Sequence, residues 1–236
     1  MANFLISKNP AIARLVERQM RNWELAREQR PESDLPPRCR VEDFVCVSRQ
    51  IGTEGQEVAV RLGEELGWPV FDREILDAMA DDDAMRRQVY ESMDERDLTW
   101  WEETLRSLMQ SEFVRNDYFK RLSETVLSLA RQGNCVFLGR GADLLLPEEV
   151  GFRVRLVAPA AVRVARIGSA NDLTRDEAEL WMGRVEAERR RYFRGHFGVE
   201  VEDPIRFDMT INLSRFSGAE VVQMVLQARS IREHSP

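Results

Sequence analysis

FVCVSRQIGTEGQE, residues 44–57, is the stretch that decides the fold class of this chain. Its first four residues form a continuous apolar run, which is typical of a strand buried on both faces of a parallel sheet. From Gln56 to Leu66, apolar residues recur on one face and predict a helix that stops at Gly67. Two glycines, Gly52 and Gly55, separate the strand from the helix. Because glycines let successive backbone N–H groups face an anion and a helix N-terminus favours negative charge, this turn is predicted to bind phosphate.

The turn lacks the Walker A pattern, because Gln56 and Glu57 stand where a lysine and a serine or threonine are expected. Arg49 is the only cation of the turn and can reach a phosphate; the alternative is a solvent-exposed arginine. Glu54 would repel a polyphosphate unless it points away or meets Arg49. Two glycines at a strand-to-helix turn also occur for steric reasons, so the turn alone is a weak signal.

Strands and helices alternate along the rest of the chain. Short apolar runs predict four more strands, at residues 69–71, 135–138, 152–157 and 208–213. Capping boxes at residues 174–177 and 217–220 predict the starts of two helices. Strands separated by helices imply parallel crossovers, so the predicted fold class is α/β, with a parallel five-stranded sheet and helices on both faces. Such sheets bind ligands at the carboxyl ends of their strands, which directs attention to the loops after Val47, Phe71 and Leu138.

A second glycine-rich loop, Gly139-Arg140-Gly141-Ala142-Asp143, follows the strand at residues 135–138. An arginine between two glycines can approach a ligand closely, and its planar guanidinium suits bidentate phosphate binding. The alternative is a turn in which Arg140 pairs with Asp143. We favour ligand binding, because two such loops at one sheet edge are less common than one. We therefore predict that Arg49, Arg140 and Arg194 converge at one edge of the sheet.

A cluster of arginines marks the end of a long predicted helix: Arg189, Arg190, Arg191 and Arg194. Such a run is usually a solvated face paired with neighbouring glutamates. Arg190 and Arg194, however, lie four residues apart and share a helix face, with His196 nearby. This arrangement suits a mobile lid that brings positive charge onto phosphates as it closes.

The N-terminal residues form a separate unit. Asn9 can cap a helix over residues 10–29, whose apolar stripe includes Leu15 and Trp23. Three prolines then exclude a helix at residues 30–40 and mark a linker. The predicted division is an N-terminal helical extension with a Pro-rich linker at residues 1–40 and an α/β domain at residues 41–236. The stripe either packs on its own domain, which we favour, or forms a homodimer contact.

Composition restricts the partners and the compartment. The net charge of −7 argues against a nucleic-acid polymer, whereas local arginine clusters suit a nucleotide or another small phosphorylated ligand. No apolar run approaches the ~18–20 residues of a membrane span. The first eight residues do not resemble a secretory signal. The three cysteines are widely spaced and lack a C-x-x-C pair, so no metal site is expected, Cys46 and Cys135 are predicted core residues, and a cytoplasmic location is predicted.

Six segments occur in a characteristic order: Ser48-Arg49-Gln50-x-Gly52-x-x-Gly55, Phe71-Asp72-Arg73-Glu74-Ile75-Leu76, Gly139-Arg140-Gly141-Ala142, Arg189 to Arg194, Glu202-Asp203-Pro204 and Phe207-Asp208-x-x-Ile211-Asn212. Together they resemble the cytidylate kinase-like family, which is related to true cytidylate kinases within the P-loop nucleoside monophosphate kinases. The likeness covers about residues 43–228, and the ordered set is far more specific than any single motif. The N-terminal helix also looks like an extension seen in part of this family.

The resemblance implies a P-loop NTPase-like fold, with ATP and Mg²⁺ as cofactors. It implies a donor-phosphate loop that contains Arg49, Gly52, Thr53, Gly55 and Gln56. It implies that an acceptor monophosphate is bound by residues among Asp72, Arg73, Arg121, Arg140 and Asp143. It implies catalytic roles for Arg140, Arg190 and Arg194. No side chain is assigned as a direct metal ligand; Asp72 and Asp143 are suggested as water-mediated substitutes for the missing P-loop Ser/Thr.

Two functions are consistent with these residues. The first is a nucleotide kinase that moves the γ-phosphoryl group of ATP to CMP or dCMP. The second is a non-catalytic nucleotide-sensing or assembly module, which keeps the phosphate-binding fold but has lost the P-loop lysine. We favour the first, because phosphoryl transfer depends on positioning and positive charge, which several arginines can supply.

Overall fold

The computed structural model of this chain describes residues 43–82 and 117–233, together with Val41 and the helical residues Arg14, Arg18 and Arg21. The predicted helix at residues 10–29 otherwise lies outside the described residues, as do the linker at residues 30–40, Cys39 and residues 83–116. The order of elements is β1 (Phe44–Arg49), α3 (Gly55–Leu66), β2 (Val70–Phe71), α4 (Arg73–Asp81), α7 (Asp117–Gln132), β3 (Cys135–Leu138), α8 (Ala142–Leu145), β4 (Phe152–Val157), α9 (Ala160–Asn171), α10 (Arg175–Phe197), the 3₁₀ turn η2 (Pro204–Arg206), β5 (Met209–Asn212) and α11 (Gly218–Glu233).

The sheet has five strands in the order β2-β3-β1-β4-β5, and every pair of neighbours is parallel. β1 lies in the middle, where Val45 is in register with Val136 of β3 on one side and Phe152 of β4 on the other. The predicted parallel five-stranded α/β fold is therefore confirmed. After β1 the chain forms β2 and β3 on one side of it, and later β4 and β5 on the other side. The direction in which strands are added therefore reverses beside β1, and parallel α/β sheets bind ligands at such a reversal.

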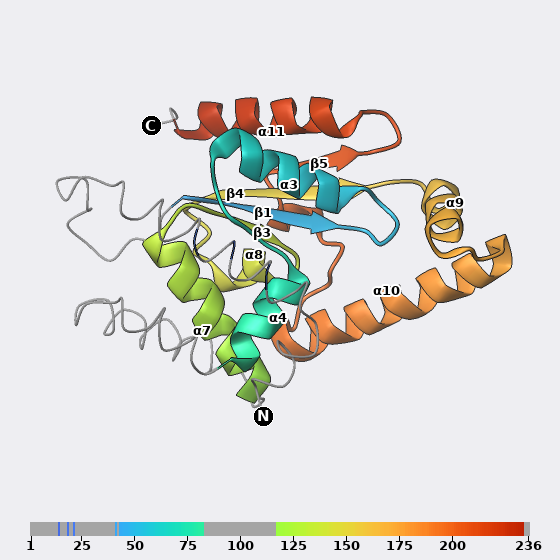
Figure 1. Cartoon of the computed structure of the whole chain (residues 1–236), viewed down its shortest axis with the longest axis horizontal. Helices are drawn as coiled ribbons and strands as arrows, with labels where there is room; N and C mark the ends of the chain where they lie inside the picture. Colours follow the sequence, from blue (N-terminus) through green and yellow to red (C-terminus); the bar gives the residue numbers. More distant parts are fainter. Residues whose placement is uncertain are drawn as a thin grey trace.

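Both faces of the sheet are covered, as the continuous apolar strands predict. Alternation along β1 sends Phe44 and Cys46 into a core shared with α4, α7 and α8, and Val45 and Val47 into a second core shared with α3 and α11. Figure 1 shows α3 and α11 above the sheet and α4 and α7 below it. Cys46 and Cys135 are buried, which confirms the prediction that they serve as small core residues.

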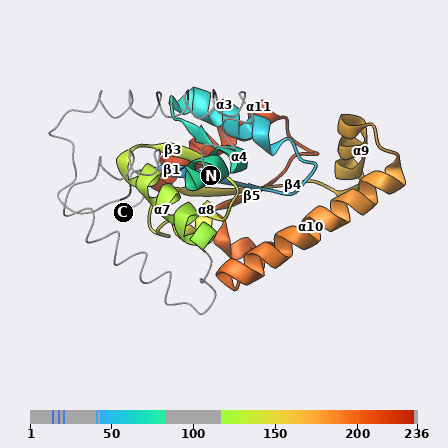
Figure 2. The ribbon, with the colours of Figure 1, turned by 60° about the horizontal axis from the view of Figure 1, so that its bottom comes forward.

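Helices α9 and α10 form an arm at the carboxyl ends of the strands (Figures 1 and 2). The predicted capping box begins α10: the Thr174 hydroxyl accepts from the Glu177 N–H, and the Glu177 carboxylate accepts from the Thr174 N–H. α10 continues for 23 residues and ends at Gly198, whose φ of 67° is left-handed. Its second half returns across the strand ends toward α4 and α7, as the turned view in Figure 2 also shows. None of the described helices combines the length and hydropathy needed to cross a membrane.

Candidate phosphate-binding site

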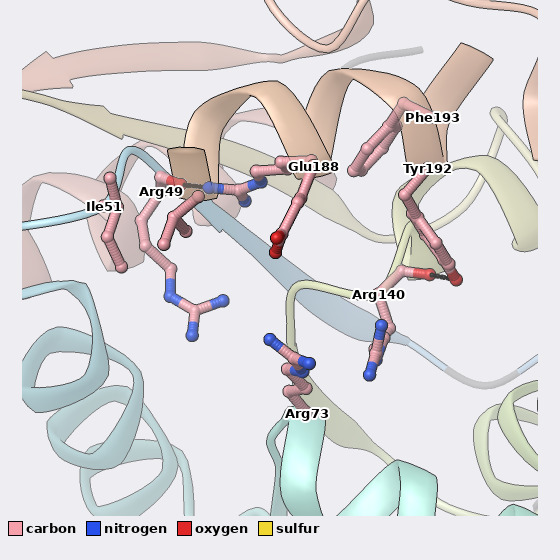
Figure 3. A pocket seen from close by; sticks show the side chains of 9 residues that line it. Arg49, Ile51, Arg73, Arg140, Glu188, Tyr192 and Phe193 are labelled. Atoms are coloured by element: carbon pink, nitrogen blue, oxygen red, sulfur yellow. Dashed lines mark hydrogen bonds between the residues drawn. The ribbon is translucent and has the colours of Figure 1, made fainter. Parts of the chain in front are cut away.

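A cavity of about 290 Å³ lies at the carboxyl ends of β1 and β3, beneath α10 (Figure 3). Nine residues line it: Arg49, Ile51, Arg73, Arg140, Val185, Glu188, Arg189, Tyr192 and Phe193. Four of them are arginines from four different segments: the end of β1, the start of α4, the loop after β3, and α10. We call this cavity the arginine pocket.

Arg49 crosses from the end of β1 into the arginine pocket, and two glycines leave room for its side chain. A Cβ on Gly55 would lie 2.8 Å from the Arg49 Cβ, and a Cβ on Gly139 would lie 2.6 Å from the Arg49 Nη1. Burial lowers the pKa of Arg49; Asp72 opposes that shift, and the cations Arg73 and Arg140 add to it. The glycines of both predicted loops therefore serve the placement of one guanidinium group, in addition to their backbone freedom.

The turn between β1 and α3 is closed by its own hydrogen bonds. The Gln50 N–H donates to the Leu156 carbonyl at 3.0 Å, and the Thr53 hydroxyl donates to the Gln50 carbonyl at 2.8 Å. Gly52 has a φ of 78°, and a Cβ there would lie 2.8 Å from the Arg163 carbonyl oxygen. Gly52, Thr53, Gly55 and Gln56 thus form a compact turn next to the arginine pocket, while Arg49 and Ile51 line it.

The negative charges of this turn are paired away from Arg49. The Glu54 carboxylate lies 3.3 Å from the Arg166 Nε on α9, so the predicted alternative in which it meets Arg49 is wrong. Glu57, which stands at the expected Ser/Thr position, lies 2.7 Å from the Arg61 Nη2 one helical turn later. Both pairs are half exposed and contribute little to stability. Their effect is to turn both carboxylates toward other partners, so that neither faces the arginine pocket.

Arg140 is held by an aromatic and acidic network. Its Nη2 donates to the Asp77 carboxylate, and the Tyr118 hydroxyl donates to the other oxygen of Asp77 at 2.5 Å. The guanidinium carbon lies 5.4 Å from the centre of the Tyr192 ring and 5.9 Å from that of Tyr118. Burial, the largest single influence, lowers the Arg140 pKa, but the Asp77 hydrogen bond and the nearby Tyr118, Asp77 and Tyr192 together outweigh it, and the pKa is raised. Arg140 itself has a φ of 55°, a conformation that is uncommon outside glycine.

The alternative in which Arg140 pairs with Asp143 is wrong. Asp143 is buried and pairs with Arg206, whose Nη1 also donates to the Glu200 carbonyl. A buried carboxylate needs a compensating cation, and Arg206, the last residue of η2, supplies it. Asp143 consequently lies outside the set of residues that line the arginine pocket.

One face of α10 forms the roof of the arginine pocket, with residues 185, 188, 189, 192 and 193 at helical spacing. Arg189 is anchored there, because its Nη1 donates to the backbone carbonyl of Arg49. Burial, together with the nearby cations Arg49 and Arg155, lowers the pKa of Arg189 to about 10, so Arg189 keeps its charge at neutral pH. A second tether joins Arg163 of α9 to Glu186 of α10.

The structure does not place the two lid arginines with Arg49 and Arg140. Arg194 is exposed and its guanidinium contacts the Glu200 carboxylate at 2.8 and 3.1 Å, and Arg190 is not among the residues that line the arginine pocket. The expected convergence of Arg194 with Arg49 and Arg140 is therefore not what the structure shows. Successive helix residues are about 100° apart, so the face that turns inward carries Arg189.

The remaining predicted acceptor residues divide between the arginine pocket and its supports. Arg73 lines the pocket, and its Nε lies 3.7 Å from the Asp77 carboxylate. Asp72 caps α4 by accepting a hydrogen bond from the Ile75 N–H at 3.0 Å. Arg121 lies 3.3 Å from Asp81 and does not line the pocket.

Sequence reasoning missed Asp77, Tyr118, Glu188 and Tyr192 as site residues, and it named Arg189 only as a member of the arginine cluster of the lid. For Glu188, Arg189 and Tyr192 a signal exists, because these residues recur with Val185 and Phe193 at helical spacing. For Asp77 and Tyr118 no local signal exists, since they meet across 41 residues of sequence.

The residues of the arginine pocket fit the phosphate groups of ATP, because guanidinium groups from several directions can each donate two hydrogen bonds to phosphate oxygens. Within the described ranges there is no group of three or more side chains of the types that hold a metal ion. A Mg²⁺ ion in this part of the chain would therefore depend on the phosphates for most of its ligands, as is usual for nucleotide-bound magnesium.

The parallel sheet and the turn between β1 and α3, which we call the phosphate turn because it is predicted to bind phosphate, define a P-loop NTPase-like α/β fold. An uncharacterized protein from Eubacterium ventriosum has a similar crystal structure, with a TM-score of 0.64 and 17% sequence identity. The superposition covers 79% of this chain and 97% of that one. At this identity the similarity supports the fold alone.

The model of the cytidylate kinase-like family matches residues 44–215, and the chain belongs to that family. It is similar to the cytidylate kinase of Pyrococcus horikoshii, with 26% identity over 102 residues, which are 43% of this chain and 53% of the relative. It is also similar to the cytidylate kinase of Sulfolobus acidocaldarius, with 32% identity over 73 residues, 31% of this chain and 40% of the relative. The matched stretch thus spans about half the length of these curated relatives.

Proposed function

We propose that this protein binds nucleotides through their phosphate groups in the arginine pocket and transfers a phosphoryl group from ATP to CMP or dCMP. The observation that carries the proposal is the convergence of Arg49, Arg73, Arg140 and Arg189 on one cavity beside the phosphate turn. Phosphoryl transfer needs positioned positive charge more than covalent chemistry, because charge on the transferred group and its neighbours must be held in place.

The positions of the arginines suggest a division of work. Arg49 at the end of β1 and the turn that follows it would hold donor phosphates, because this turn leads into the N-terminus of α3. Arg73 and Arg140 would hold the acceptor phosphate, and Arg189 lies over both from α10. When bound, ATP supplies the phosphoryl group and Mg²⁺ offsets part of its charge. Because the net charge of the chain is −7, we infer that the ligand is a small phosphorylated molecule rather than a nucleic-acid polymer. We also propose that the protein acts in the cytoplasm.

A second function, nucleotide sensing without catalysis, is favoured by the phosphate turn. Gln56 replaces the P-loop lysine, and Glu57 at the Ser/Thr position is already paired with Arg61. In this alternative the pocket binds nucleotide and reports it to a partner, for example through a homodimer formed by the N-terminal segment.

The test combines binding and turnover on the full chain. Calorimetric titration with ATP and with CMP should show binding that Arg49→Ala or Arg140→Ala weakens about tenfold or more, since a hydrogen bond to a charged group contributes ~1.5–3 kcal/mol. Arg184→Ala is the matched control, because Arg184 is an exposed arginine of α10 outside the pocket.

Turnover separates the two functions. We expect ADP formation with ATP and CMP at less than ~1 per second, the low end for kinases, because the turn lacks its lysine. Binding without any ADP formation would favour the sensing function. No binding of either nucleotide at millimolar concentration would refute both.

A further inference from the structure

Glu188 is the only carboxylate among the described residues that line the arginine pocket. It lies on the same face of α10 as Arg189, and Figure 3 shows its carboxylate pointing into the space between Arg49, Arg73 and Arg140. Although this space is strongly cationic, Glu188 has no ion pair or side-chain hydrogen bond with any described residue. The pocket therefore contains a carboxylate whose oxygens are available to a ligand.

Four other acidic side chains of the described segments near the pocket form ion pairs or hydrogen bonds. Asp77 accepts from Tyr118 and Arg140, Glu186 from Arg163, Asp143 from Arg206, and Glu54 pairs with Arg166. Those carboxylates orient or neutralise particular arginines. Glu188 serves no such structural purpose, and its place on the roof exposes it to whatever anion enters.

A carboxylate at this position changes which anion the arginines prefer. A pocket of arginines alone would favour the most negative form of a polyphosphate, which is the form without a metal ion. Glu188 repels that form. A divalent cation bound to the phosphates removes the repulsion and can accept a carboxylate oxygen as a ligand, directly or through water.

We propose that Glu188 makes the arginine pocket selective for the Mg²⁺ complex of a polyphosphate over the free polyphosphate. This inference rests on the proposed function, in which the polyphosphate is that of ATP. No group of three or more metal-ligating side chains occurs within the described ranges, so the cation would arrive with its ligand and Glu188 would offer it a carboxylate oxygen. Glu188 thereby determines specificity and prevents free phosphates from occupying the pocket.

The experiment compares the wild-type protein, Glu188→Gln and Glu179→Gln by calorimetric titration. Glu179 is the matched control, because it is an exposed glutamate of the same helix outside the pocket. Each protein is titrated with ATP and, separately, with inorganic pyrophosphate, in excess Mg²⁺ and in EDTA. For each probe, the readout is the ratio of the affinity measured in excess Mg²⁺ to the affinity measured in EDTA.

We expect the wild-type protein and Glu179→Gln to bind both probes more tightly with Mg²⁺. Glu188→Gln should bind the metal-free probes at least about tenfold more tightly than the wild type does, because the substitution removes one negative charge a few ångströms from the bound anion. Its preference for the Mg²⁺ complex should disappear or reverse. An equal gain for both forms would overturn the inference, because Glu188 would then be a general repulsive charge; an unchanged ratio would also overturn it.

The two probes separate this inference from the proposed function. If pyrophosphate shows the Glu188-dependent preference and ATP does not bind, the inference holds and the nucleotide proposal fails. If ATP binds with the same Mg²⁺ ratio in Glu188→Gln as in the wild type, the proposal holds and the inference fails. If neither probe binds the wild-type protein, both fail.

Discussion

The guanidinium of Arg189 donates a hydrogen bond to the backbone carbonyl of Arg49. This contact joins α10 to the end of β1 across 140 residues of sequence. Because the side chain of Arg49 enters the same cavity, two of the four arginines of the pocket belong to one connected unit. The roof of the pocket is thus held in position by one of its own cationic residues.

Arg189→Ala should lower kcat/KM for ATP and CMP about tenfold or more, because it removes both a cation of the pocket and the tether of α10. Arg189→Lys should recover only part of the loss, since an ammonium cannot reproduce the planar fork of a guanidinium. Arg194→Ala should have a smaller effect, because Arg194 pairs with exposed Glu200. Steady-state kinetics on the three variants checks this order, and a larger loss for Arg194→Ala would show that the lid rearranges on binding.

Gly139→Ala should weaken nucleotide binding more than it destabilises the fold. The new Cβ would lie 2.6 Å from the Arg49 Nη1, the far end of a flexible side chain, so the guanidinium would be displaced. The φ of 82° adds strain of ~1–2 kcal/mol.

Gly67→Ala is the control for that strain. Gly67 has a φ of 66°, but nothing lies within 4 Å of a Cβ built there. Both variants should lose similar free energy of unfolding in urea, while only Gly139→Ala should lose affinity for ATP. Equal affinities would show that Arg49 does not depend on the space at Gly139.

Asp77→Asn should raise the KM for CMP with little change in kcat, because Asp77 orients Arg140 and does not line the pocket. Tyr118→Phe removes one of the two hydrogen bonds to Asp77 and should have a weaker effect of the same kind. Asp43→Asn breaks a similar pair with Arg229 outside the pocket and should leave KM unchanged. A fall in kcat alone for Asp77→Asn would contradict a positioning role.

Acidification should destabilise the protein through His196. Burial lowers the pKa of His196, as does Arg140, and the ring stacks on Phe119 with a centroid distance of 4.9 Å. Since the folded pKa lies below the unfolded value, the unfolded state binds more protons as the pH falls through about 6.5. The free energy of unfolding should therefore decrease from pH 7.5 to pH 5.5.

His196→Phe keeps the stack and removes the titration. Urea unfolding of this variant at the two pH values should show a smaller decrease than the wild type. An identical decrease in both proteins would assign the pH dependence to other groups.

Local sequence was sufficient for the architecture. The apolar runs at residues 44–47 and 135–138 predict buried strands, and burial on both faces follows from their lack of polar alternation. The glycines after β1 and the capping box at Thr174 likewise depend on neighbours within a few residues. From these signals the sheet, its helices and the edge that carries the site could all be predicted. The reversal of strand order beside β1 also indicates where the ligand binds, because parallel α/β sheets bind ligands at such a reversal.

Tertiary structure alone decided which charges face one another. Arg140 has Asp143 three residues away, yet it pairs with Asp77, 63 residues distant, because the packing of α4 beneath β3 brings that carboxylate to it. Along α10 each residue points about 100° from the next, and the burial of Ala178, Met182 and Phe193 sets the rotation of the helix. That rotation turns Arg189 and Glu188 into the pocket and leaves Arg194 in solvent. The sequence by itself determined where phosphate could bind, whereas the packing of distant elements determined which side chains would meet it, since side-chain partners depend on distances that no local pattern records.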